Sequence, residues 1–317
     1  MKNPLQILIA VDDFTEQHID RISDAVQEWG EIRRISQDAA PDNYQSALQR
    51  AQIAVGWPDP RWLPGTAVTL LQVGSSGWDA YDTAEMRASG IVVCSGRGIY
   101  SIGVAEHCIA MMFALARRLP VHIHDQQQGI FRRHAPYAEI AGASACIVGP
   151  GSIGMELASR CRGLGMRVIA VAREKSTIQA PIERFFSVND LKIAVQQSDH
   201  VFLTVPGHRA NQKLFSREVL EAFRPTTYFY NVSRGTTVDE EALYELLAEG
   251  KIAGAGLDVT TVEPLPSDSP LWKLGDNVLI TGHSAGLSQG YPERFCALAI
   301  RNLRRFHNGE ELENRVL

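Results

Sequence analysis

The sequence predicts an α/β protein with two doubly wound parallel sheets. Two observations predict this class. Apolar runs of strand length alternate with amphipathic helical segments through most of the 317 residues, which is the pattern of parallel strands joined by crossover helices. A cluster of glycines at residues 149–154 restarts the alternation near the middle of the chain. A second block of strands and helices is therefore expected after the first.

The expected elements follow from hydrophobic periodicity. Apolar runs predict strands at residues 5–11, 53–55, 68–73, 91–93, 144–148, 167–171, 201–205, 228–232 and 252–258. Amphipathic patterns predict long helices at residues 16–29, 101–118 and 290–307. Residues 122–134 read as a polar stretch between the blocks. The last helix lies beyond the second block and is placed to cross back to the first.

Composition excludes several classes of protein. Hydrophobic residues make up 45% of the chain and charged residues 21%, as in ordinary globular proteins. A net charge of −5 argues against a protein that coats nucleic acid or an anionic membrane surface. The longest apolar run, residues 108–116, is much shorter than the roughly 20 residues that cross a bilayer. The N-terminus reads as a first strand rather than a signal peptide.

Scattered cysteines predict a reducing compartment. They form no CxxC pair and have no zinc-finger spacing to histidine, and they stand at positions 94, 108, 146, 161 and 296. Most lie in apolar stretches, where a free cysteine behaves as a small core residue. We therefore expect buried, reduced thiols and a cytoplasmic protein. No set of His, Asp and Glu has metal-ligand spacing, so no metal site is expected.

The glycine cluster predicts a dinucleotide site. The motif GPGSIG lies between an apolar strand and a helix that leads to a second strand, as the dinucleotide fingerprint requires. Gly149 permits the tight turn, Gly151 lets the backbone approach a pyrophosphate, and Gly154 lets helix and strand pack closely. The amides of Ser152 and Ile153 at the helix start then face the phosphates. The second block is therefore expected to be a Rossmann fold, and the strand–helix alternation of the first block predicts a Rossmann-like fold there too.

The end of the second strand indicates which coenzyme fits. NAD-binding folds place an acidic residue there to bind the ribose 2′-hydroxyl, but this chain has Ala172. Arg173 can clamp a 2′-phosphate through two N–H groups, and Ser176 can donate a hydrogen bond. We therefore expect NADP(H) to be preferred, with NAD(H) possible. A solvated surface arginine with relaxed coenzyme choice is the alternative.

Three charged residues after strands predict reduction of a 2-oxo acid. Arg234, Glu263 and His283 follow strand-like runs, and ligands of parallel sheets bind at the carboxyl ends of strands. Arginine suits the substrate carboxylate, histidine suits proton donation near pH 7, and a carboxylate on the other ring nitrogen orients the imidazole. Taken singly, the three residues would fit a structural ion pair, a surface carboxylate and a loop histidine.

The chain resembles the D-isomer-specific 2-hydroxyacid dehydrogenase family along nearly its whole length. The matching motifs, in the family's order and spacing, are GPGSIG, NVSRGTTVDEEAL, AGAGLDV, EPLPSDSPLW and GHSAG. The resemblance implies a discontinuous substrate domain at residues 1–99 plus 288–317 and a dinucleotide-binding domain at residues 100–287. It also implies a cleft that closes on substrate and a homodimer built mainly through the coenzyme domains.

The resemblance assigns roles to single residues. Arg234 would bind the substrate carboxylate and keto oxygen, His283 would be the acid/base, and Glu263 its partner. Asp258 would help hold the nicotinamide carboxamide. The other cofactor positions that it implies are Val205, Pro206, Val232, Ser233 and Gly286. The substrate loop that it implies contains Ser75, Ser76 and Gly77, where the amides of the last two would receive the substrate carboxylate.

Departures from the family pattern leave the substrate's side chain open. They are Gly282 before the histidine, Tyr100 near the hinge, residues 207–209 after Pro206, and Phe131 in the arm between the domains. We expect reduction of glyoxylate, hydroxypyruvate or a similar acid to the D-2-hydroxy acid. NAD-dependent oxidation of D-3-phosphoglycerate is the alternative, and a non-catalytic nicotinamide sensor is a further one that the intact Arg–Glu–His set argues against.

Overall fold

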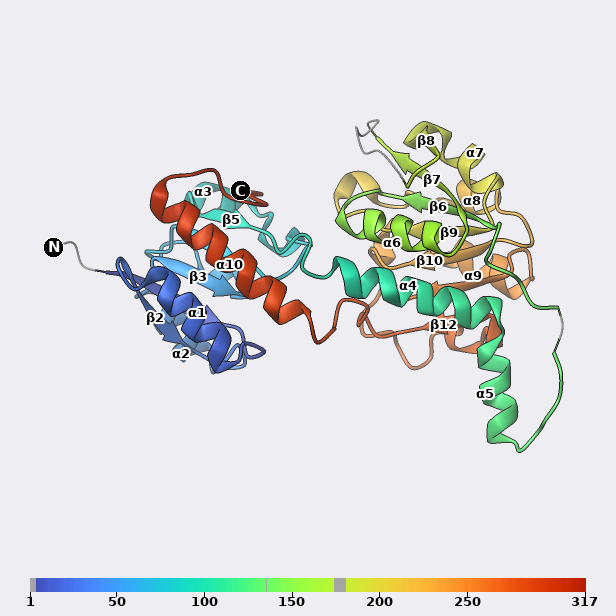
Figure 1. Ribbon diagram of the computed structural model, residues 1–317, viewed down its shortest axis with the longest axis horizontal. Helices are drawn as coiled ribbons and strands as arrows, with labels where there is room; N and C mark the ends of the chain where they lie inside the picture. Colours follow the sequence, from blue (N-terminus) through green and yellow to red (C-terminus); the bar gives the residue numbers. More distant parts are fainter. Residues whose placement is uncertain (1–3, 135, 174–180) are drawn as a thin grey trace. The chain divides into compact units, whose positions relative to one another are not determined.

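The computed structural model describes residues 4–134, 136–173 and 181–317, which form two compact units (Figure 1). Unit 1 combines the chain up to Tyr100 with Ser288–Leu317, and unit 2 is Ser101–Leu287. Each unit contains one parallel sheet between helices, and unit 1 is built from two separate segments of the chain. The predicted fold class is confirmed.

The sheet of unit 1 has the strand order β2-β1-β3-β4-β5. Its strands are β1 (Leu5–Ala10), β2 (Gly30–Arg34), β3 (Ile53–Gly56), β4 (Leu70–Gln72) and β5 (Val92–Cys94). Its helices are α1 (Glu16–Val26) and α10 (Tyr291–Asn308) on one face, with α2 (Pro41–Leu48) and α3 (Ala84–Ser89) on the other. Because side chains alternate along a strand, Ile7 and Ile9 pack under the first pair while Leu8 and Ala10 pack under the second.

The sheet of unit 2 has the strand order β12-β11-β10-β9-β6-β7-β8. Its strands are β6 (Ser144–Val148), β7 (Arg167–Ala172), β8 (Arg184–Ser187), β9 (His200–Leu203), β10 (Tyr228–Asn231), β11 (Gly254–Leu257) and β12 (Val278–Ile280). Its covering helices are α4 (Ser101–Ala116) and α6 (Ser152–Gly163) on one face, with α7 (Leu191–Gln196), α8 (Arg217–Leu220) and α9 (Glu240–Ala248) on the other. All strand pairs are parallel, so the carboxyl ends of its strands share one edge.

Several elements were not predicted from the sequence. They are the strands β2, β8 and β12, each at the edge of a sheet, and the helices α2, α3 and α5 (Leu119–Gln127). Helix α5 occupies part of the stretch read as polar, and it projects away from the sheet of unit 2 (Figure 1). Over the part of the chain that the structure describes, no helix has the length and apolarity needed to cross a membrane.

Candidate active site

Close backbone contacts shape the glycine turn after β6. Gly149 has φ +97°, and a Cβ there would lie 2.9 Å from the amide nitrogen of Val205. A Cβ at Gly154 would lie 2.4 Å from the carbonyl oxygen of Gly149, so α6 approaches the turn too closely for a side chain. A Cβ at Gly151 would meet nothing within 4 Å. The turn therefore has open space where a pyrophosphate can approach the backbone.

Helix α6 offers its first amides to this space. No side chain caps the helix, whose N-cap is Gly151. The N–H groups of Ser152, Ile153 and Gly154 precede the first backbone bond of the helix, which runs from Met155 to the carbonyl of Gly151. These donors and the helix dipole favour an anion, so the turn fits the pyrophosphate of a dinucleotide.

Arg173 follows β7, beside the glycine turn. Its side chain is exposed, and its Nη2 donates a 2.5 Å hydrogen bond to Oδ1 of Asn211. Ser176, the other residue predicted to bind a 2′-phosphate, lies outside the described residues. A guanidinium group thus follows Ala172, the residue at the end of β7 where NAD-binding folds place an acidic residue.

The segments after β9 and β10 are joined beside the same turn. Ser233 Oγ donates a 2.5 Å hydrogen bond to the carbonyl oxygen of Val205, and Thr204 Oγ1 donates a 2.7 Å bond to that of Gly149. The predicted cofactor-lining residues of these segments are Val205, Pro206, Val232 and Ser233. They lie at the carboxyl edge of the sheet, and their contact with a cofactor stays a prediction.

Arg234 is carried by a turn that packs against the loop containing Glu263. Its carbonyl oxygen accepts hydrogen bonds from Asn231 Nδ2 at 3.1 Å and from Thr237 Oγ1 at 2.5 Å, which fix the backbone of the turn. The next residue, Gly235, is so close to the Glu263 loop that a Cβ there would lie 2.0 Å from the carbonyl carbon of Thr260. The sheet edge therefore holds the two predicted residues in adjoining loops.

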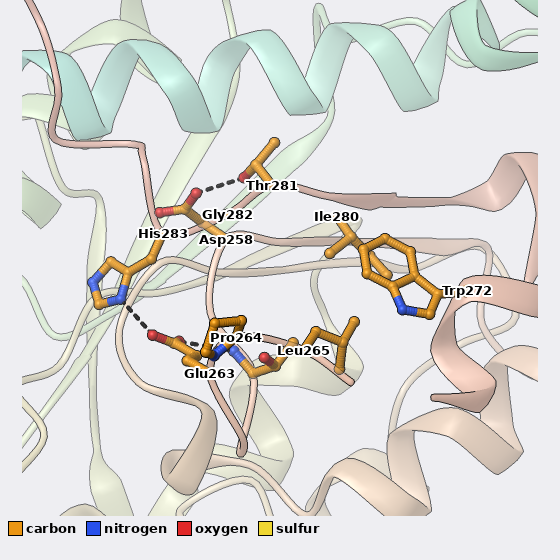
Figure 2. Close-up of a pocket in the computed structure, with 10 residues that line it drawn as sticks. Asp258, Glu263, Pro264, Leu265, Trp272, Ile280, Thr281, Gly282 and His283 are labelled. Carbon is orange, nitrogen blue, oxygen red and sulfur yellow. Dashed lines mark hydrogen bonds and ion pairs between the residues drawn. The ribbon is translucent and has the colours of Figure 1, made fainter. Parts of the chain in front are cut away.

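His283 and Glu263 form the pair that the sequence predicts. Nδ1 of His283 lies 2.7 Å from Oε2 of Glu263 (Figure 2). Because a carboxylate only accepts hydrogen bonds, Nδ1 carries a proton, and Nε2 is the ring nitrogen left for proton exchange with another molecule. Oε1 of Glu263 accepts a 3.1 Å bond from the amide of Thr260. Both oxygens of Glu263 are thus engaged, and the imidazole is held in one orientation.

Asp258 holds the loop that carries His283. Its carboxylate is 3% exposed and accepts 3.0 Å hydrogen bonds from the amides of Ser284 and Ala285. Thr281 Oγ1 donates to the same carboxylate at 2.5 Å, as Figure 2 shows, and Nε2 of His107 on α4 lies 3.0 Å from that hydroxyl. Loop 281–285 therefore occupies both oxygens of Asp258, and the predicted contact with nicotinamide stays a prediction.

A cavity of about 500 Å³ adjoins the histidine–glutamate pair. Its lining residues are Asp258, Thr260, Glu263, Pro264, Leu265, Trp272, Ile280, Thr281, Gly282 and His283. The ionisable side chains lie at one end and the side chains of Leu265, Ile280 and Trp272 at the other (Figure 2). Gly286, which the sequence places among the cofactor residues, follows in the turn after His283.

The predicted substrate loop belongs to unit 1, where it follows β4. Ser75 accepts a 2.8 Å hydrogen bond on its carbonyl oxygen from the amide of Gly96. Ser76 Oγ lies 3.5 Å from the carbonyl oxygen of Gly96. Within the described parts of the chain, the amides of Ser76 and Gly77 donate no hydrogen bond, which suits the anion-binding role that the resemblance implies.

The sequence reasoning missed the residues that position the predicted ones. Asn211 bonds Arg173, Thr281 links His107 to Asp258, and Gly235 seats the Arg234 turn. None has a chemical signature of its own, since Asn, Thr and Gly are ordinary loop residues. A glycine directly after the candidate Arg234 is a local signal from which a close backbone contact could have been predicted.

The chain matches a family model, two named relatives and a solved structure. The model of the D-isomer specific 2-hydroxyacid dehydrogenase, NAD binding domain, matches residues 109–285. A glyoxylate reductase of Korarchaeum cryptofilum is 34% identical over 248 residues, 76% of this chain and 73% of the relative. A D-3-phosphoglycerate dehydrogenase of Archaeoglobus fulgidus is 35% identical over 214 residues, 66% of this chain and 40% of the relative. A D-isomer specific 2-hydroxyacid dehydrogenase family protein from Aeromonas salmonicida superposes with a TM-score of 0.87 at 26% identity, covering 99% of both chains.

Proposed function

The chain belongs to the D-isomer specific 2-hydroxyacid dehydrogenase family, and from that premise we propose that it reduces a small 2-oxo acid, such as glyoxylate or hydroxypyruvate, to the D-2-hydroxy acid with NADPH. The observation that carries the proposal is the 2.7 Å contact between His283 and Glu263, at the same sheet edge as the glycine turn. An oriented acid/base beside a dinucleotide turn suits the interconversion of a ketone and an alcohol.

Each candidate residue has a separate role in the proposed reduction. NADPH supplies a hydride when it is bound, and each ketone reduced takes up one hydride and one proton. Glu263 holds Nδ1 of His283, so that Nε2 gives its proton to the keto oxygen as negative charge develops there. Arg234 binds the substrate carboxylate and keto oxygen through its planar fork. The amides of Ser76 and Gly77 are proposed as further donors to the carboxylate.

Two observations support the substrate and coenzyme. The relative from Korarchaeum cryptofilum is a glyoxylate reductase, and Ala172 with the following Arg173 replaces the acidic residue of NAD-binding folds. The test is NADPH oxidation, followed by absorbance, with a panel that includes glyoxylate, hydroxypyruvate, pyruvate and bulkier 2-oxo acids. We expect turnover with the small acids and a higher kcat/KM for NADPH than for NADH. No oxidation with any member of the panel would reject the proposal.

The second candidate is NAD-dependent oxidation of D-3-phosphoglycerate. The relative from Archaeoglobus fulgidus supports it, but this chain spans only 40% of that protein. The substrate phosphate would need cations, for which Arg61, Arg87 and Arg97 of unit 1 are the candidates. Arg61 and Arg87 are already paired with Asp59 and Asp82, which favours the first candidate. Activity on phosphoglycerate that exceeds activity on hydroxypyruvate would reverse this order.

The remaining family features are also proposed for this chain. Unit 1 is proposed as the substrate domain, corresponding to residues 1–99 plus 288–317, and unit 2 as the dinucleotide-binding domain. A homodimer through unit 2 is supported by exposed apolar side chains on and after α5, including Ile123 at 55% and Phe131 at 106% exposure. Sedimentation of the purified protein tests this. A cytoplasmic location is supported by five free, buried cysteines.

A further inference from the structure

The hydrogen bond between Arg173 and Asn211 crosses the dinucleotide turn. In the sheet, β6 pairs with β7 on one side and with β9 on the other. Arg173 follows β7, and Asn211 ends a short 3₁₀ helix, Arg209–Asn211, in the segment after β9. Their 2.5 Å contact therefore joins the two neighbours of β6 at the edge where its glycine turn begins. A ligand on that turn would have both residues beside it.

The neighbouring backbone fixes the side chain of Asn211. The residue is 5% exposed, and its Nδ2 donates a 2.8 Å hydrogen bond to the carbonyl oxygen of Pro206. Because only the amide nitrogen can donate to a carbonyl, the opposite atom, Oδ1, has to face Arg173. Its backbone amide donates a 2.7 Å bond to the carbonyl oxygen of His208. Asn211 is therefore a rigid acceptor rather than a side chain that follows the arginine.

The bond restricts Arg173 without neutralising it. One acceptor uses one of the five N–H donors of the guanidinium, and the others stay available for an anion. The acceptor is a neutral amide, and no carboxylate within the described ranges forms an ion pair with Arg173. An arginine loses considerable side-chain entropy when it is ordered, so a partner that restricts it beforehand lowers that cost of binding.

We propose that Asn211 is a positioning residue for coenzyme choice, which holds the Arg173 guanidinium ready for the 2′-phosphate of NADPH. This inference rests on the proposed NADPH preference and adds to it a residue 38 positions after Arg173, which the fingerprint does not include. Asn211 acts only through Arg173, so its effect is confined to ligands that carry a 2′-phosphate. A residue that merely braced the loop after β9 would affect both coenzymes alike.

The experiment measures binding of adenosine 2′,5′-bisphosphate and of 5′-AMP by calorimetry, together with kcat/KM for NADPH and NADH. Arg173→Ala should weaken the bisphosphate at least about tenfold, as expected for a charge-assisted contact. Asn211→Ala should weaken binding of the bisphosphate about fivefold, the scale of one neutral hydrogen bond. It should leave the affinity for 5′-AMP and kcat/KM for NADH within about twofold of the wild-type values. In the Arg173→Ala background, Asn211→Ala should have no further effect on the bisphosphate.

Matched variants distinguish a failure of the coenzyme proposal from a failure of the inference about Asn211. Gln212→Ala changes the exposed neighbour of Asn211 and should leave the affinity for both ligands unchanged. Asn211→Asp keeps the size of the side chain and adds a charge opposed to the phosphate, so it should weaken the bisphosphate more than Asn211→Ala does; it also serves if the alanine variant does not fold. If Arg173→Ala leaves the bisphosphate unaffected, the coenzyme proposal is wrong and this inference with it. If Arg173→Ala acts while Asn211→Ala does not, or if Asn211→Ala weakens both ligands equally, only the inference about Asn211 is overturned.

Discussion

A methyl group at position 235 would overlap the backbone of the loop that carries Glu263. In Gly235→Ala, the new Cβ would lie 2.0 Å from the carbonyl carbon of Thr260, 2.1 Å from its oxygen and 2.2 Å from the amide nitrogen of Thr261. Unstrained contacts between such atoms are about 3.5 Å. The two loops must therefore separate by more than about 1 Å, because neither backbone segment can rotate away as a flexible side chain would.

That separation would act on the histidine–glutamate pair. The amide of Thr260 binds Oε1 of Glu263 at 3.1 Å, and Oε2 binds His283, so displacing Thr260 displaces the carboxylate. A misplacement of about 1 Å at a reacting group can cost about a hundredfold in rate, and overpacking costs about 1–3 kcal/mol of stability. We expect kcat to fall at least about thirtyfold, measured as NADPH oxidation at saturating substrate, while a thermal melt confirms that the variant is folded.

The control is the same substitution where the structure has room. Gly163 ends helix α6, and a Cβ there would meet nothing within 4 Å. Gly163→Ala should leave kcat unchanged and raise stability by up to about 1 kcal/mol, since alanine is the better helix residue. A folded Gly235→Ala enzyme that turns over at the wild-type rate would refute the link between the two loops.

Three further predictions test other parts of the structure. His283→Ala should lower turnover at least about a hundredfold, within the range for a lost general acid, and Glu263→Gln should lower it less because an amide still accepts from Nδ1; equal turnover of all three proteins would contradict the assignment. Gly154→Ala should weaken binding of both NADPH and NADH, measured by fluorescence titration, because its Cβ would lie 2.4 Å from the carbonyl oxygen of Gly149. Burial lowers the pKa of His200 from 6.5 to about 4. The unfolded chain therefore binds more protons between these values, so this contribution to stability is complete above pH 6.5 and is lost as the pH falls towards 4. Over that interval, urea unfolding should show the wild type losing about 3 kcal/mol more than His200→Phe does; parallel pH profiles would contradict this.

Which strands the sequence reveals depends on their place in the sheet. The central strands β1, β3, β6 and β9 are largely buried on both faces and appear in the sequence as mostly apolar runs. The strands missed by the sequence are all at edges. For example, β2 reads GEIRR with every residue at least partly exposed, and β8 reads RFFS with only Phe186 buried. Such strands form because a neighbour supplies backbone hydrogen bonds, and side-chain hydrophobicity says little about them.

Helix α5 was missed for a related reason. Its sequence, LPVHIHDQQ, has only Val121 and Asp125 buried, so no apolar face marks it as a helix. The acid Asp125 is buried because Arg132 and His134 of the following segment bind it at 2.8 and 2.6 Å. The hydrogen bonds from Arg132 and His134 lower the pKa of the Asp125 carboxyl below its usual value. Helix α5 is therefore held by polar contacts with the segment that follows it, and not by an apolar face packed against the sheet.

The sequence alone determined the fold class, the position of the dinucleotide turn and the residue types needed for proton transfer. Each of these depends on local patterns of neighbouring residues, which can be recognised without the tertiary structure. Only the tertiary structure decided which patterns meet. The order β12-β11-β10-β9-β6-β7-β8 brings Arg173 to Asn211 and His283 to Glu263, and it also sets Gly235 against Thr260. Strand order is a property of packing between distant segments, and hydrogen-bond distances follow from that packing, so neither can be read from local periodicity.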